Sequence, residues 1–213
     1  MIGKILGWPH RGEWVMGIAL AMTGFAAAGC DDLGNSFVVS LQPFYTKLDL
    51  EADPGLAGTW KDQEGDVSFT FEEGAKKEYT MVVKEREGGQ ETSGEFEAHL
   101  MRLGGSWFID LFPKNTSSRG DEFYRSFSFR GHSIARVEVG QDSMKMAFMS
   151  GRWLSARIRE KSIDTPHEKA DGSLLLTGTT EEVQELANLY ANDEKAFADP
   201  LTLERTRVEE DVP

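Results

Sequence analysis

Apolar and polar side chains alternate along short stretches of this chain, and that pattern limits the available folds more than any other feature. In the stretch VSFTF, Val67, Phe69 and Phe71 lie on one face, with a serine and a threonine on the other. Similar stretches occupy residues 79–84, 95–100, 106–112, 133–139, 143–148 and 173–177, and 123–129 is a candidate further strand. Period-two segments separated by short Gly/Asp-rich turns are typical of an antiparallel meander, and closure into a barrel removes its exposed edges. We therefore predict a mostly β protein with an up-and-down antiparallel barrel.

Two segments show helical spacing instead. The first, SGRWLSARIREKS at 150–162, places its apolar side chains on one side of a helix. The second, TTEEVQELANLYAND at 179–193, begins with Thr179 and Glu182, the spacing of a capping box. We predict two or three accessory helices, one of which lies on the barrel or plugs one end of it.

The N-terminus has the character of an export signal. A basic segment with Lys4 and Arg11 precedes an apolar run from Trp14 to Ala28. This run is shorter than the ~20 residues that a membrane-spanning helix needs. A basic start, a short apolar run and small residues before a junction predict a secretory signal. Either Met1 or Met16 fits as the start of translation.

The sequence Ala27-Ala28-Gly29-Cys30 resembles the lipobox of bacterial lipoproteins. That resemblance implies cleavage before Cys30, the only cysteine of the chain, and its modification by a diacylglycerol and a further acyl chain such as palmitate. Two or three acyl chains anchor a protein stably. We expect a lipid-anchored protein of the cell envelope that faces the periplasm, with Asp31 favouring the inner membrane. The alternative is an uncleaved signal anchor with an incidental cysteine.

The exported chain is strongly acidic. Of 23 basic and 36 acidic residues in the whole chain, Lys4, Arg11 and Glu13 lie before Cys30, which leaves 21 basic and 35 acidic side chains. A net charge of −14 argues against nucleic-acid binding, because phosphate backbones would repel it.

Gly58-Thr59-Trp60 opens the first predicted strand and resembles the G-x-W signature of lipocalins. More widely, PFYTKLDLEADPGLAGTW, GEFEAHLMRLGGSWFIDLFP, HEKADGSLLLTGTTEEVQEL and AFADPLTLER resemble uncharacterised bacterial lipoproteins with a lipocalin-like domain. The resemblance implies that Trp60 packs across the closed end of the barrel. It also implies an arginine stacked on that tryptophan, for which Arg205 and Arg207 are candidates by their order in the chain.

These features divide the chain into four parts. We expect a signal peptide (1–29), a lipidated tether and lead-in (30–55), a lipocalin-like barrel with C-terminal helices (56–207) and an acidic tail (208–213).

We predict a binding module for a small apolar ligand held inside the barrel, with no cofactor. The alternative is an envelope scaffold or protein-interaction module whose barrel is packed and holds no ligand. The candidate inward-facing residues are Trp60, Phe69, Phe71, Met81, Phe96, Leu100, Met146 and Phe148.

The best candidate for catalysis or metal binding is the run Glu95, Glu97 and His99, with Asp110 on the next strand. Two carboxylates and an imidazole could bind a divalent metal or act as an acid–base pair. Alternation, however, assigns these residues to the face opposite the core, where polar side chains meet water. Common hydrolase motifs are absent from the sequence. We therefore predict no metal site and no enzymatic activity.

Overall fold

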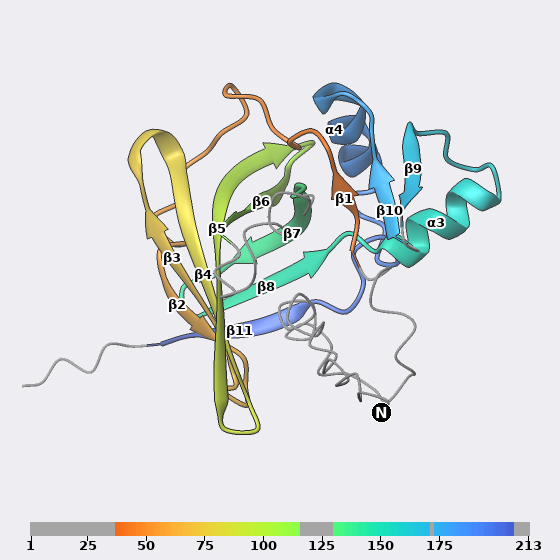
Figure 1. Ribbon diagram of the computed structural model, residues 1–213. Helices are drawn as coiled ribbons and strands as arrows, with labels where there is room; N and C mark the ends of the chain where they lie inside the picture. Colours follow the sequence, from red (N-terminus) through yellow and green to blue (C-terminus); the bar gives the residue numbers. More distant parts are fainter. Residues whose placement is uncertain (1–36, 116–129, 171–172, 207–213) are drawn as a thin grey trace, which may run out of the picture.

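The computed structural model describes residues 37–115, 130–170 and 173–206 (Figure 1). This part of the chain is mostly β, with a closed barrel of eight strands, a separate three-stranded sheet and two α-helices. The predicted signal peptide, Cys30, the candidate strand at 123–129, Arg207 and the acidic tail lie outside the described residues. Among the described residues, no helix is long and apolar enough to cross a membrane.

The antiparallel barrel predicted from the alternation is confirmed. Seven of its strands follow one another in the chain and in space, and β11 (Leu201–Arg205) closes the barrel by pairing with both β8 and β2. The first seven are β2 (Gly58–Lys61), β3 (Val67–Glu73), β4 (Glu78–Glu87), β5 (Gln90–Leu103), β6 (Ser106–Asn115), β7 (Ser133–Val139) and β8 (Ser143–Phe148). A short 3-10 turn, η2 (Ala75–Lys77), joins β3 to β4.

A second, smaller sheet lies beside the barrel. It has the order β1-β10-β9, from β1 (Val39–Ser40), β10 (Ser173–Leu176) and β9 (His167–Ala170). The expectation that 173–177 continues the meander is therefore wrong. Leu174 and Leu176 are buried in a cluster outside the barrel, so the apolar side chains of β10 stabilise another layer.

Both predicted helices are present, as α3 (Gly151–Arg159) and α4 (Thr180–Leu189). Helix α4 begins with the predicted capping box. The Thr179 hydroxyl accepts from the Glu182 N–H at 3.3 Å, and the Glu182 carboxylate accepts from the Thr179 N–H at 2.7 Å. Each side chain thus satisfies a backbone donor that the first helical turn leaves free.

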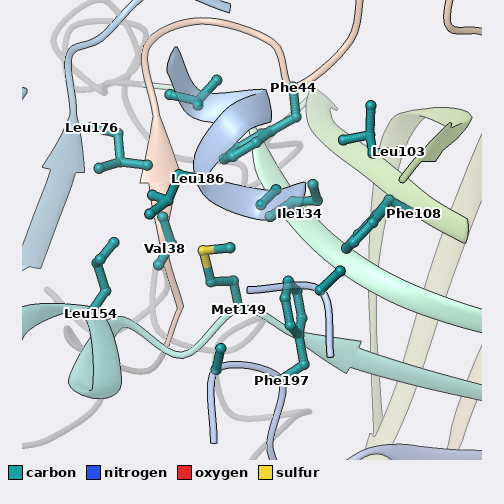
Figure 2. Packing of buried hydrophobic residues seen from close by; sticks show 14 of the residues in the cluster. Val38, Phe44, Leu103, Phe108, Ile134, Met149, Leu154, Leu176, Leu186 and Phe197 are labelled. Atoms are coloured by element: carbon teal, nitrogen blue, oxygen red, sulfur yellow. The ribbon is translucent and has the colours of Figure 1, made fainter. Parts of the chain in front are cut away.

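Two apolar cores lie on opposite sides of the barrel wall. One fills the barrel, and the other lies between the outer faces of β5–β8 and the layer formed by the small sheet and the two helices. In this outer core, Leu103, Phe108 and Ile134 from the barrel wall pack with Phe44 and with Leu186 of α4 (Figure 2). Strands β5–β7 are therefore buried on both faces over part of their length.

Residues 37–51, which are called the lead-in from here on, join the two layers. Near its start, Phe37 bridges to Ser150 just before α3, and Ser40 bridges to His132 before β7. Near its end, Leu50 bridges to Met101, and the Glu51 N–H donates to the Leu100 carbonyl at 2.9 Å. Strand β5 extends beyond its last pair with β4, and the lead-in occupies the edge that β4 leaves open.

Candidate functional site

The structure places all eight candidate ligand-binding residues in or against the apolar cluster inside the barrel. Their exposed fractions differ along the barrel. Trp60, Phe69, Phe71, Met81, Leu100 and Met146 are 0–2% exposed, Phe148 is 9% exposed and Phe96 is half-buried. Phe96 lies in the middle of β5, where it pairs with Met81, and Phe148 is the last residue of β8.

The middle of the barrel is filled by these side chains. A void with room for one water molecule would leave accessible surface on the groups that line it. Trp60, Phe69 and Met81 have none, and Tyr79 and Leu111 add further bulk to the same cluster. The six most buried residues therefore pack against one another as a core, and the half-buried Phe96 packs against it.

One end of the barrel is closed by Trp60 and Arg205. The guanidinium carbon of Arg205 lies 4.1 Å from the centre of the Trp60 ring, and these residues are register partners between β11 and β2. Arg205 also donates to the carbonyls of Gly55, Ala57 and Gln141. This is the contact that the lipocalin resemblance implies, and the register selects Arg205 for it.

The glycine of Gly58-Thr59-Trp60 makes room for that arginine. Gly58 has a φ of 125°, and a Cβ added there would lie 2.7 Å from an Arg205 nitrogen. A side chain at this position would therefore be strained by both its backbone conformation and its neighbour.

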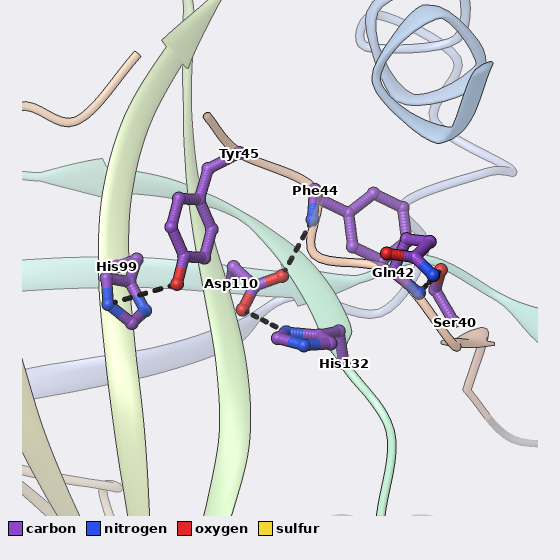
Figure 3. A network of polar contacts seen from close by, with 7 residues as sticks. All are labelled: Ser40, Gln42, Phe44, Tyr45, His99, Asp110 and His132. Carbon is purple, nitrogen blue, oxygen red and sulfur yellow. Dashed lines mark hydrogen bonds and ion pairs between the residues drawn. The ribbon is translucent and has the colours of Figure 1, made fainter. Parts of the chain in front are cut away.

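A polar network lies on the outer face of the barrel, under the lead-in (Figure 3). Asp110 is 0% exposed, and its two carboxylate oxygens have different partners. One oxygen accepts from the Phe44 N–H at 3.0 Å, and the other lies 2.8 Å from Nδ1 of His132. This carboxylate therefore joins three chain segments: the lead-in, β6 and the residue before β7.

A second polar pair adjoins the first. His99 faces Asp110 across the β5–β6 ladder, and its ring stacks on Tyr45 with the ring centres 4.2 Å apart. The Tyr45 hydroxyl lies 3.3 Å from Nε2 of His99. Nδ1 of His99 is buried without a hydrogen-bond partner.

Burial sets the protonation of this pair. The pKa of Tyr45 is raised to about 12. Removal from water is the largest cause, and the negative charges of Asp110, Glu97 and Glu78 add to it. Burial also lowers the pKa of His99, although the neighbouring carboxylates partly offset that effect. Both rings are therefore neutral at pH 7, and the protonated phenol can donate to Nε2.

The expectation that Glu97, His99 and Asp110 share a water-exposed face is wrong for two of the three. Glu97 is exposed, but His99 is 5% exposed and Asp110 is fully buried. The alternation of polar and apolar residues correctly predicted that these side chains point away from the barrel interior. It could not show that the lead-in covers this part of the outer wall.

The network provides little for catalysis. Tyr45 holds its proton tightly, because its pKa is about 12, and Asp110 is occupied by a backbone amide and an imidazole. Within the described ranges, no group of three or more histidine, cysteine or acidic side chains could hold a metal ion. The geometry instead fastens the lead-in to the barrel wall.

Sequence reasoning missed Tyr45 and His132 as members of this network. Tyr45 lies in a segment without periodicity, and His132 is isolated from the other histidines. Each contacts a partner that is far away in the sequence: Tyr45 and His99, for example, are 54 positions apart. The apolar content of PFYTKLDL was the available signal that this segment packs against the domain.

Two surface clefts accompany the filled interior. One of about 390 Å³ lies between the lead-in and the start of α4, lined by Gln42, Tyr45, Thr46 and residues 177–181. The other, about 320 Å³, lies on the outer wall of β2–β4, where charged and hydroxyl side chains line it. Both have polar walls, unlike the interior predicted to hold an apolar ligand.

Comparisons with protein-family models, curated proteins and solved structures give no match for this chain.

The lowered pKa of His99 predicts how stability changes with pH. The unfolded chain takes up a proton near pH 6.5, whereas the folded protein resists protonation of the buried ring until the pH is lower. The free energy of unfolding should therefore fall as the pH falls through 6.5, by at most about 1.4 kcal/mol per pH unit. Urea unfolding at pH 7.5 and 5.5 measures this change. In His99→Phe the fall should be smaller, and an equal fall in both proteins would contradict the assignment.

Proposed function

We propose that the protein is a lipid-anchored lipoprotein of the cell envelope whose packed, lipocalin-like barrel is a rigid scaffold that acts through its outer surface. The observation that carries this proposal is the filled interior. A drug-sized ligand needs a cavity of ~300 Å³ or more. The aromatic side chains of Trp60, Phe69 and Phe71 are 0–2% exposed inside the barrel, so neighbouring side chains fill the space around them.

The rival function, storage of a small apolar molecule, would require a large rearrangement. Side chains such as Trp60 and Met81 would have to leave positions where they are 0% exposed. Close-packed protein interiors resist changes of even one methylene group. Trp60 is further held by its indole N–H, which donates to the Leu56 carbonyl at 2.9 Å. The packing thus favours the scaffold over the binding module.

The polar network supports a role without catalysis. Its groups stabilise the position of the lead-in, and the single thiol of the chain is Cys30, which we assign to the lipid. Acylation with two or three chains would hold the protein at the bilayer, because each buried methylene contributes ~0.8 kcal/mol. Asp31, directly after Cys30, favours the periplasmic side of the inner membrane for the anchored form.

Mass spectrometry of the full chain purified from bacterial membranes tests both parts of this proposal. We expect an N-terminal peptide that begins at Cys30 and carries a diacylglycerol, and native spectra without a co-purifying apolar molecule. Cys30→Ala is the matched control and should be lost from the membrane fraction. Density-gradient fractionation of the same membranes locates the anchored form.

Two results would contradict the proposal separately. An unmodified Cys30, or an unchanged membrane yield of Cys30→Ala, would overturn the lipid anchor. A stoichiometric apolar ligand in the native spectra would overturn the packed scaffold.

A further inference from the structure

Helix α3 carries a charge opposite to that of the rest of the protein. Residues 152–161 contain four basic side chains, Arg152, Arg157, Arg159 and Lys161, and one acidic side chain, Glu160. Through residue 169 the count is five basic and three acidic, so this segment stays basic in a chain with a net charge of −13. The positive charge is therefore concentrated at one place on an acidic molecule.

The exposed face of α3 is shaped for contact with a flat, charged surface. Arg152 and Arg159 are exposed and lie seven residues apart, which puts them on the same side of the helix. Ser155 and Ala156, between them, are small. On the same helix, Arg157 lies over the Trp153 ring and pairs with Glu160 at 3.6 Å.

The opposite face holds α3 firmly in place. Trp153 and Leu154 are 9% and 0% exposed in the outer core, and Ile158 packs against the same cluster. The Ser150 hydroxyl caps the first turn by accepting from the Trp153 N–H at 3.2 Å. The arginines are therefore carried by a rigid element at the edge of the molecule, on the side away from β3 (Figure 1).

The start of the described chain lies directly beside this helix. Phe37 bridges to Ser150, and the Val38 N–H donates to the Met149 carbonyl at 3.1 Å. Phe37 is seven residues after Cys30. Seven residues span at most about 25 Å, so an acyl anchor at Cys30 would keep α3 within that distance of the bilayer.

We propose that the exposed face of α3, together with Lys161, lies on the headgroups of anionic phospholipids and sets the orientation of the barrel at the membrane. This inference rests on the proposed lipid anchor at Cys30. The basic helix is attracted to an anionic bilayer, whereas the acidic remainder is repelled from it, and both forces turn the same side toward the lipid. The wall formed by β3 then faces away from the membrane.

A fluorescent label on α3 tests this orientation. Because Cys30 is acylated, Ser162→Cys provides a single free thiol on the full, lipidated chain, and Glu72→Cys provides a reference label on β3. The labelled proteins are reconstituted in vesicles of phosphatidylcholine alone or with phosphatidylglycerol, and quenching by acrylamide from the aqueous phase is measured. We expect the Ser162→Cys label to be shielded only in the anionic vesicles, and the Glu72→Cys label to remain accessible in both.

Charge-removing variants show whether the basic side chains cause the effect. Each Lys or Arg near an anionic surface contributes about fivefold to the docked-to-undocked ratio. The triple variant Arg152→Gln, Arg159→Gln, Lys161→Gln should therefore lower that ratio about a hundredfold, as should ~1 M salt. The control Lys47→Gln, Lys61→Gln, Lys76→Gln removes the same charge from exposed positions elsewhere and should leave the label shielded.

The possible failures are distinguishable. Equal accessibility of the Ser162→Cys label in both kinds of vesicle, with acylation of Cys30 verified by mass, would overturn the orientation alone. Equal effects of the two triple variants would do the same. An unmodified Cys30 would remove the anchor and, with it, the tether that places α3 at the bilayer.

Discussion

Replacing Trp60 by alanine is expected to lower the free energy of unfolding by about 3–5 kcal/mol. Trp60 is 0% exposed, so its removal leaves a cavity in the barrel core and the buried Leu56 carbonyl without its donor. The Arg205 guanidinium loses the ring on which it stacks. For a domain of this size the melting temperature should fall by roughly 10 °C. Thermal and urea unfolding measure both quantities.

Trp107→Ala is the matched control for that experiment. Trp107 is also on the inward side of its strand and also has an arginine nearby, with the guanidinium carbon of Arg102 5.5 Å from the ring centre. It is only half-buried, and its loss should cost less than half as much. Equal losses in the two variants would show that Trp60 has no special part in closing the barrel.

Replacing Asp110 by alanine is expected to cost about 3 kcal/mol and to loosen the lead-in. The variant removes the acceptor of the Phe44 N–H and the partner of His132 at a position that is 0% exposed. Hydrogen exchange at the Phe44 amide should accelerate strongly, because that donor loses its only described partner. Urea unfolding gives the energetic cost, and exchange measured by mass spectrometry or NMR gives the local effect.

Asp110→Asn separates the hydrogen bonds from the shape of the side chain. The asparagine oxygen can still accept from Phe44, and its amide can donate to Nδ1 of a neutral His132. We therefore expect a loss of about 1 kcal/mol or less, with the Phe44 amide still protected. If Asp110→Ala is no less stable than Asp110→Asn, the carboxylate is not what fastens the lead-in.

The interior of the barrel was predictable from the sequence because the period of a strand is local. Phe69 and Phe71 face inward for the same reason that Ser68 and Thr70 do not: successive side chains point to opposite faces. The capping box of α4 is equally local, since Thr179 and Glu182 satisfy each other within one turn. Such features require no knowledge of the rest of the chain.

The partners of the short strands could not be predicted in this way. Strand β10 has an apolar run like a barrel strand, yet it pairs with β9 and β1 in the second layer. Strand β11 is the eighth barrel strand because it pairs with both β8 and β2. Short runs fit more than one sheet, and which sheet forms depends on the sum of many distant contacts.

The same distinction explains the site. The sequence by itself determined that His99 and Asp110 point away from the barrel interior, because the alternation along β5 and β6 assigns a face to each residue. Only the tertiary structure decided that they are buried, since the lead-in that covers them lies more than 50 positions away in the chain. A period in the sequence states which side of a strand a residue occupies. Whether water or another layer meets that side depends on contacts between distant segments.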